Sequence, residues 1–299
     1  MAARHMQFAL LIELIIYLVV SLALIDQGWI GVQVFGLSLG LAILVRGLLV
    51  AVTYLFAWVW QSKPPEDLKV GAGKRLRAML QEWLALLAMS IAIPFEARLM
   101  GPDRLRRPDE GRLPLLLIHG YLANRGFWYW VRKRLESAGW VVATLNLEPS
   151  YSDIDDYADL IAQRVDAVVS ATGSDRLALV GHSMGGLAAR AYLRKYGNSR
   201  VARLVTLASP HHGSRLTTFG WGRNAQQMHV GSEWLTSLNA SKAGIFPTTV
   251  SVFSYGDNLV MPQESSRLEG CINIAVPAVG HVGMAISTAF SNTLIEVLT

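Results

Sequence analysis

The chain has 299 residues, of which 52% are hydrophobic and only 16% are charged. Its mean hydropathy of +0.33 is high for a soluble protein, and most of the apolar excess lies in residues 1–100. The net charge is +5, but no basic run is interleaved with aromatic residues, so the composition argues against nucleic-acid binding and favours a basic surface next to a membrane. A single cysteine, Cys271, excludes an intrachain disulfide; it falls in a predicted strand, and we expect a small buried side chain there.

Two long apolar runs open the chain. The first, Phe8 to Ile25, contains Glu13 as its only charge and is just long enough to cross a bilayer as a helix. A secretory signal peptide is the alternative, but the run is long for one, no cleavage site of small residues follows it, and a second apolar run begins at once. We therefore expect a retained membrane helix.

The second run extends from Trp29 to Trp60 and contains one charge, Arg46. Either a helix covers about Leu37 to Trp60 with Arg46 buried or snorkelling, or the helix ends near Val45 and the remainder lies at the membrane interface. Aromatic residues near the end of the run suit an interfacial belt. Residues 1–60 are thus predicted to form a transmembrane helical hairpin.

Residues 61–112 are predicted to be a basic linker followed by an amphipathic or interfacial helix. The helix is expected within Leu76 to Met100, where the uncharged core from Trp83 to Phe95 includes Pro94 and is short for a third span. Two spans leave both ends of the hairpin on one side of the membrane, and the basic linker places that side in the cytoplasm. Three spans would place the rest of the chain outside.

Within residues 113–299, short apolar runs alternate with helical patterns. The expected strands are 115–118, 141–145, 177–180, 201–207, 250–254 and 271–276, and the expected helices include 127–137, 155–171 and 187–196. Apolar runs this short, separated by helices, indicate a mainly parallel sheet covered on both faces. The predicted fold class is α/β, preceded by the helical hairpin.

The clearest motif is Gly-x-Ser-x-Gly at residues 181–185, directly after the apolar run 177–180 and before a helical pattern. Strand, sharp turn and helix in this order are the setting in which the motif presents a nucleophilic serine. The turn strains the serine backbone, and its glycines are small because strand and helix leave no room for side chains. Ser183 is therefore the candidate nucleophile, and a glycine-rich turn before an ordinary helix is the alternative.

A serine hydroxyl needs a base to accept its proton and an acidic group to hold that base. Among the seven histidines, only His281 follows the last predicted strand, where a loop can carry its imidazole over Ser183. Asp257 follows the preceding strand and is the candidate acid, although an Asp-Asn turn would explain it too. Glu264 and Glu269 are the reserve acids.

Attack by a serine creates an oxyanion, which needs two backbone N–H groups aimed at it. We expect one from Met184, the residue after the nucleophile, and the other from Tyr121, in the loop after the first strand of this domain. The alternative for Tyr121 is an aromatic residue at the edge of a pocket. His119 is expected to brace the loop rather than to react.

No cofactor is expected. His211 and His212 are adjacent, so their side chains point apart on an extended segment, and no nearby carboxylate cluster completes a metal shell. The chain has neither a P-loop nor a dinucleotide-binding fingerprint. The aromatic-rich stretch 209–247 lies where a lid would sit, with ordinary packing of a helix on the sheet as the alternative.

Residues 113–299 resemble the bacterial lipase/esterase group of the α/β-hydrolase superfamily. The motifs that carry the resemblance occur in the family's order and span most of the domain: Leu-Ile-His-Gly-Tyr at 117–121, Gly-His-Ser-Met-Gly-Gly at 181–186, Leu-Ala-Ser-Pro-His-His-Gly-Ser at 207–214, Ser-Tyr-Gly-Asp-Asn-Leu-Val at 254–260 and Val-Gly-His-Val-Gly at 279–283. The resemblance implies carboxylic-ester hydrolysis with a triad of Ser183, Asp257 and His281. It also implies Tyr121 and Met184 as oxyanion donors, while the first 112 residues lie outside it.

The sequence thus predicts a membrane-anchored serine hydrolase that cleaves lipid acyl esters through an acyl-enzyme. Its expected partners are the ester substrate and a membrane, which the resemblance indicates to be the bacterial inner membrane, with the catalytic domain in the cytoplasm. Acyl transfer to an alcohol or thioester cleavage would use the same triad and is the first alternative. A non-catalytic, membrane-tethered interaction module is the second; a missing triad member would mark it, and none is missing.

Overall fold

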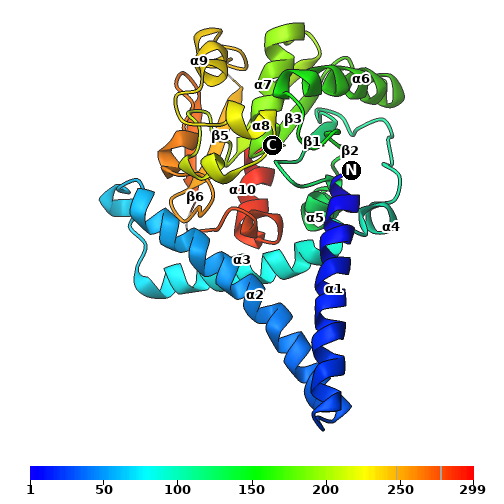
Figure 1. Ribbon diagram of the computed structural model, residues 1–299. Coiled ribbons are helices and arrows are strands. Elements are labelled where there is room, and N and C mark those ends of the chain that lie inside the picture. The colour runs from blue at the N-terminus through cyan, green and yellow to red at the C-terminus, as the bar shows by residue number, and fades with distance from the viewer. Residues whose placement is uncertain (247, 277) are drawn as a thin grey trace.

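The structure, a computed structural model, describes residues 1–246, 248–276 and 278–299. An α/β domain forms the bulk of the molecule, and two long helices project from it as a hairpin (Figure 1). Both ends of the hairpin lie at the α/β domain, and its turn lies at the far tip.

Within the described residues, six strands form one parallel sheet in the order β2-β1-β3-β4-β5-β6. They are β1 (Leu115–Ile118), β2 (Val142–Leu145), β3 (Leu177–His182), β4 (Val201–Leu207), β5 (Thr249–Ser254) and β6 (Ile272–Val276). Every residue of β1, β3 and β5 is buried, as expected for short apolar strands in a parallel sheet with helices on both faces. The predicted α/β class and all six strands are confirmed.

The expectation for Cys271 is wrong on both points. Cys271 lies just before β6 and is only partly buried. The reason is that β6 is an edge strand, whose first residue, Ile272, is exposed. An apolar edge strand and an apolar central strand look alike in a sequence.

Helices cover both faces of the sheet. One core layer is formed by α6 and α7, and the other by α5, α10 and an earlier helix, α3 (Ala72–Ala92). The helices and 3-10 turns of the domain are η2 (Arg125–Trp128), α5 (Tyr129–Ser137), α6 (Ile154–Thr172), α7 (Met184–Tyr196), η3 (Arg215–Phe219), α8 (Arg223–Gln227), α9 (Glu233–Ala240), η4 (Gln263–Ser266), η5 (Gly283–Ala285) and α10 (Thr288–Leu298). The stretch 209–247 therefore supplies short helices beside the carboxyl end of the sheet.

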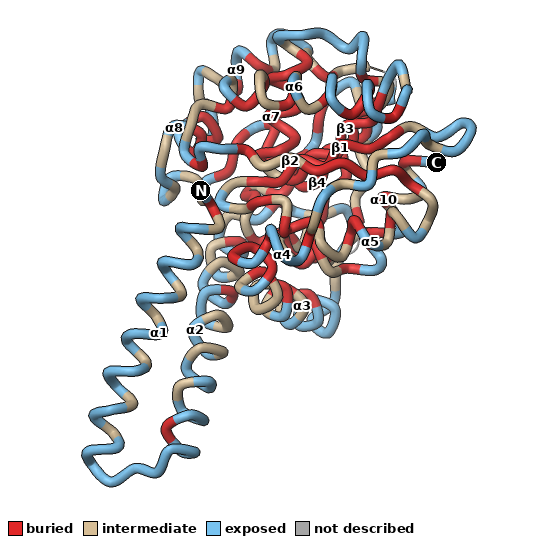
Figure 2. Tube along the Cα trace, turned by 90° about the vertical axis from the view of Figure 1, so that its right-hand side faces the viewer, coloured by how far each residue is buried: buried red, intermediate tan, exposed pale blue. Residues whose placement is uncertain are grey.

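The projecting hairpin consists of α1 (Ala2–Asp26) and α2 (Gly31–Trp60). These are the two described helices that are long and apolar enough to cross a membrane, and they are largely exposed (Figure 2). Arg46 does not interrupt α2, so the continuous helix is found, although it begins well before Leu37. The guanidinium of Arg46 pairs with Glu13 of α1, with 2.7 Å between Nη2 and Oε2. The single charge of each apolar run therefore neutralises the other.

A shorter helix, α3 (Ala72–Ala92), crosses the base of the α/β domain beside α2, after the short 3-10 turn η1 (Glu66–Leu68) (Figure 1). It ends before Pro94, whose ring cannot continue a helix, and α4 (Glu96–Met100) follows. The predicted single helix over 76–100 is therefore two helices.

The face of α3 that meets the domain is buried and has helical spacing: Ala78, Glu82, Ala85, Met89 and Ala92. A second set of apolar residues is exposed on α3 and just after it: Leu76, Leu80, Leu84, Ile91 and Phe95. The helix thus has one apolar side packed on the α/β domain and another free of it.

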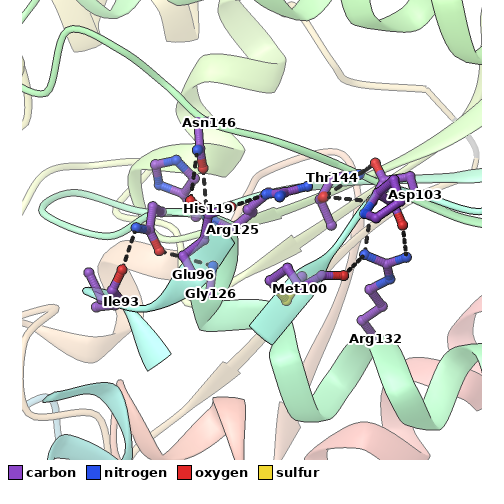
Figure 3. Close-up of polar contacts among 12 residues, drawn as sticks. Ile93, Glu96, Met100, Asp103, His119, Arg125, Gly126, Arg132, Thr144 and Asn146 are labelled. Atoms are coloured by element: carbon purple, nitrogen blue, oxygen red, sulfur yellow. Dashed lines mark hydrogen bonds and ion pairs between the residues drawn. The ribbon is translucent and has the colours of Figure 1, made fainter. Parts of the chain in front are cut away.

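Polar contacts hold residues 93–103 against the α/β domain (Figure 3). Asp103 accepts the N–H of Thr144 on β2 at 2.7 Å and pairs with Arg132 at 2.9 Å. Glu96 pairs with Arg125 of η2. The segment that leads out of the hairpin region is therefore bound to the domain before β1 begins.

Candidate active site

Ser183 stands at a strained turn between β3 and α7. Its backbone has φ 54° and ψ −125°, a conformation that costs free energy for a residue with a side chain. The turn is held by the hydrogen bond from the Ser183 N–H to the carbonyl of Leu207 at 2.8 Å. Ser183 is partly exposed, as a nucleophile must be to reach a substrate.

Glycines surround this turn because neighbouring backbone leaves no space for a Cβ atom. A Cβ on Gly181 would lie 2.5 Å from the nitrogen of Gly186, and one on Gly185 would lie 2.6 Å from the carbonyl oxygen of His119. A Cβ on Gly120 would lie 2.8 Å from the Cβ of Ser183. The glycines at 181 and 185 therefore allow strand, turn and helix to pack closely around the serine.

His281 and Asp257 form a buried pair. The Nδ1 of His281 lies 2.7 Å from Oδ2 of Asp257, and the two side chains are 6% and 2% exposed. The other carboxylate oxygen of Asp257 accepts the N–H groups of Leu259 and Val260 at 2.7 and 2.9 Å. Asp257 is thus fixed after β5, while the reserve acids Glu264 and Glu269 are exposed at the surface.

The environment of His281 favours the charged imidazole. Burial by itself lowers the pKa of His281, but the negative charge of Asp257, the hydrogen bond to it and the charge of Glu82 outweigh burial. The net result is a pKa above the ordinary value of 6.5. This environment stabilises the imidazolium form that His281 takes after it has accepted a proton.

Ser183 and His281 both line a cavity of about 470 Å³. The structure brings Tyr121 to the same cavity, whereas Asp257 lies behind His281 and Met184 is buried at the first position of α7. Among the described residues no hydrogen bond joins Ser183 to His281; in unliganded sites such bonds are often long and tighten with substrate.

The side chain of Tyr121 has a function of its own. Its hydroxyl accepts the N–H of Trp221 at 2.9 Å and donates to the carbonyl of the same residue at 2.7 Å. Tyr121 therefore fastens the loop after β1 to the stretch 209–247.

His119 braces the loop, as expected. Its Nε2 accepts the N–H of Leu147 at 2.9 Å, and its Nδ1 lies 2.9 Å from the carbonyl oxygen of Gly120. Burial lowers the pKa of His119 to about 4, so this imidazole is neutral at pH 7. His182 is buried as well; its ring stacks on that of Phe127 and lies tilted at 52° to that of His281.

His211 is fully buried, and both of its ring nitrogens already have protein partners. Its Nε2 lies 3.0 Å from the hydroxyl of Thr206, and its Nδ1 lies 3.3 Å from the guanidinium of Arg190. No group of three or more metal-ligating side chains is found within the described ranges.

Within 209–246, one part fits the interpretation as a lid and another part fits ordinary packing on the sheet. Phe219 and Trp221 are 61% and 79% exposed and border the cavity, as a lid would. Trp234 and Phe246 instead pack against the core beneath. Only the first part of the stretch therefore covers the candidate site.

Sequence reasoning missed the contribution of the N-terminal helices to this site. Leu86, Met89 and Ile93, in and just after α3, line the cavity, and so does Met6 of α1. Glu82 of α3 accepts backbone N–H groups beside His281. In the sequence, Glu82 is a lone carboxylate among apolar residues at helical spacing. The prediction placed the helix that contains it at a membrane interface.

Comparisons with known proteins support the fold. Residues 114–252 match the family model described as "alpha/beta hydrolase fold". The chain is 33% identical over 116 residues to a triacylglycerol lipase of Pseudarthrobacter phenanthrenivorans, covering 36% of each chain. It is equally identical over 116 residues to a triacylglycerol lipase of Burkholderia plantarii, covering 36% of this chain and 32% of the other. It thus spans about a third of the length of these relatives.

A Bacillus licheniformis lipase in its mature form has the same fold. The two structures superpose with a TM-score of 0.58 at 18% identity, over 66% of this chain and 96% of the lipase. Lipase B of Aspergillus fumigatus gives a TM-score of 0.53 at 18% identity, over 62% of this chain and 52% of the other. The matched sequence motifs, the parallel sheet and the strained serine turn agree, and residues 114–252 therefore have the α/β-hydrolase fold.

Proposed function

We propose that this protein is a membrane-anchored serine hydrolase that cleaves the carboxylic esters of lipid acyl chains. One observation carries the proposal: Ser183 on its strained turn and the buried His281–Asp257 pair open onto the same apolar cavity. The triacylglycerol lipases that share sequence with the chain support an acyl-ester substrate.

In the proposed reaction His281 accepts the proton of the Ser183 hydroxyl as its oxygen attacks the ester carbonyl. Asp257 orients the imidazole and stabilises its positive charge. The backbone N–H groups of Tyr121 and Met184 receive the oxyanion, His281 returns the proton to the leaving alcohol, and an acyl-enzyme forms on Ser183. Water activated by His281 then releases the fatty acid and restores the serine.

In this proposal, membrane anchoring keeps the α/β domain next to its lipid substrate. The hairpin of α1 and α2 crosses the bilayer in this proposal, with Glu13 and Arg46 paired inside it. Both hairpin ends lie at the α/β domain, so two spans keep the domain on one side. The basic linker after Trp60 assigns that side to the cytoplasm of a bacterial inner membrane.

The test is hydrolysis of p-nitrophenyl esters of increasing chain length, from acetate to palmitate, by the detergent-solubilised full chain. We expect activity that increases toward long chains and disappears in Ser183→Ala. Ester hydrolysis that survives in folded Ser183→Ala would overturn the mechanism. Product analysis with an added alcohol separates hydrolysis from acyl transfer, since a new ester would appear only in the second case.

A further inference from the structure

The carboxylate of Glu82 grips the loop that carries His281. It accepts the backbone N–H of Val282 at 3.0 Å and that of Gly283 at 2.6 Å, one on each oxygen. Glu82 belongs to α3, about two hundred residues away in the sequence, and it is 2% exposed. The two residues directly after the candidate base are thus held from outside the α/β domain.

The sequence around His281 makes room for this carboxylate. A Cβ on Gly280 would lie 2.7 Å from Cδ of Glu82 and 2.8 Å from the hydroxyl of Tyr54, and one on Gly283 would lie 3.1 Å from Oε2 of Glu82. The glycines on either side of His281 therefore permit the close approach of Glu82. The hydroxyl of Tyr54, from α2, donates to the carbonyl of Gly256 at 3.3 Å and lies beside Gly280 as well.

A buried carboxylate is costly unless charges or hydrogen bonds compensate it. Among the described residues Glu82 has no lysine or arginine partner; the groups that face it are the two N–H donors, the imidazole of His281, the carboxylate of Asp257 and the phenol of Tyr54. Of these groups, only His281 can supply a positive charge. Glu82 is therefore placed where it interacts best with the imidazolium that forms when Ser183 loses its proton.

We propose that Glu82 is a positioning residue of the active site: it fixes the backbone after His281 and its carboxylate stabilises the protonated imidazole. This proposal rests on the proposed serine mechanism. It adds a second carboxylate to the Ser183–His281–Asp257 arrangement, one supplied by a helix of the N-terminal region.

The experiment compares the full-length wild type with Glu82→Gln in detergent, using a p-nitrophenyl ester and a fluorophosphonate that labels Ser183. Glutamine keeps the volume and one acceptor oxygen, but it presents an amide N–H₂ to the second N–H and carries no charge. We expect kcat and the labelling rate to fall about 10- to 100-fold, because a misplaced base loses most of its efficiency, with KM little changed. Glu66→Gln is the matched control, since Glu66 is an exposed carboxylate bound only to Lys69.

The pH profile separates positioning from mere support of the fold. Burial raises the pKa of Glu82 to about 7, so Glu82 and His281 titrate as a coupled pair. The charged form of Glu82 raises the pKa of His281, and its removal in Glu82→Gln therefore moves the acid limb of kcat/KM to lower pH. Wild-type kcat in Glu82→Gln, or a loss that disappears when rates are divided by the folded fraction and leaves the acid limb unmoved, would overturn the proposal. A wild-type chain that neither hydrolyses esters nor reacts with the fluorophosphonate would instead remove the serine mechanism, and this proposal with it.

Discussion

Phe56 of the apolar hairpin stacks on Phe219 of the segment that borders the cavity, with ring centroids 5.6 Å apart and planes 28° apart. The cover of the candidate site therefore rests on α2. Phe219 is 61% exposed, and this ring pair joins it to α2.

We predict that Phe219→Ala raises KM for long-chain esters roughly 2- to 10-fold, because an aromatic pair contributes about 0.5–1.5 kcal/mol. Phe56→Ala is expected to have a similar effect through the other member of the pair. The measurement is KM for a long and a short p-nitrophenyl ester, and the short ester is the control. Equal changes for both chain lengths would argue against a role in binding the acyl chain.

Asp257→Asn is expected to lower kcat on the order of 10⁴-fold, since an amide favours the wrong tautomer of His281 and cannot neutralise its charge. The measurement is kcat in folded protein, with folding checked by thermal denaturation. Glu264→Gln changes an exposed acid considered as the reserve and is expected to leave kcat as it is. The reverse result would reassign the acid.

The pH dependence of kcat/KM follows from the raised pKa of His281. Only the neutral imidazole can accept the serine proton, so we expect activity to fall as the pH decreases through a midpoint above 6.5. Stability has the opposite sign: the pair with Asp257 stabilises the folded chain fully below the unfolded pKa, and this contribution is lost as the pH rises through the folded pKa. An acid limb with its midpoint below 6.5 would contradict a raised pKa for His281.

The pair of Glu13 and Arg46 predicts a non-additive mutant cycle. Arg46→Leu leaves Glu13 without a positive partner, although the hydroxyl of Tyr17 still donates to it. We expect the loss of the ion pair to cost about 3–5 kcal/mol of stability in micelles. Removal of both charges in the double variant Glu13→Leu, Arg46→Leu is expected to restore most of that loss. Denaturation of the wild type, the two single variants Arg46→Leu and Glu13→Leu, and the double variant by increasing SDS measures the effect, and additive losses would show that the two charges do not interact.

The α/β domain was predictable because its signals are local. Strands such as 115–118 and 201–207 are short apolar runs between turn residues. The serine turn is likewise formed by consecutive residues, 181–185. Asp257 followed from its place after a strand. Each of these inferences uses neighbours in sequence, and the structure places Asp257 in contact with His281.

The partners supplied by distant segments were not predictable in this way. Glu82, Tyr54 and Phe56 reach the site because α2 and α3 pack against the α/β domain, and no pattern within 1–112 identifies the loop that each one contacts. The lone carboxylate of α3 was visible, yet a polar residue in an apolar helix fits a membrane interface equally well. Cys271 shows the same limit, since the sequence does not tell an edge strand from a central one.

The dependence of the His281 loop on α3 has a consequence for how this chain can be divided. A fragment that begins at Leu113 would retain every residue of the family motifs, yet it would leave the N–H groups of Val282 and Gly283 without acceptors and remove Met89 from the cavity wall. The family motifs all lie within residues 113–299, whereas the packing around His281 also requires α3. Residues 72–92 are therefore part of the packed interior around His281, and replacing them would remove the acceptors of the His281 loop.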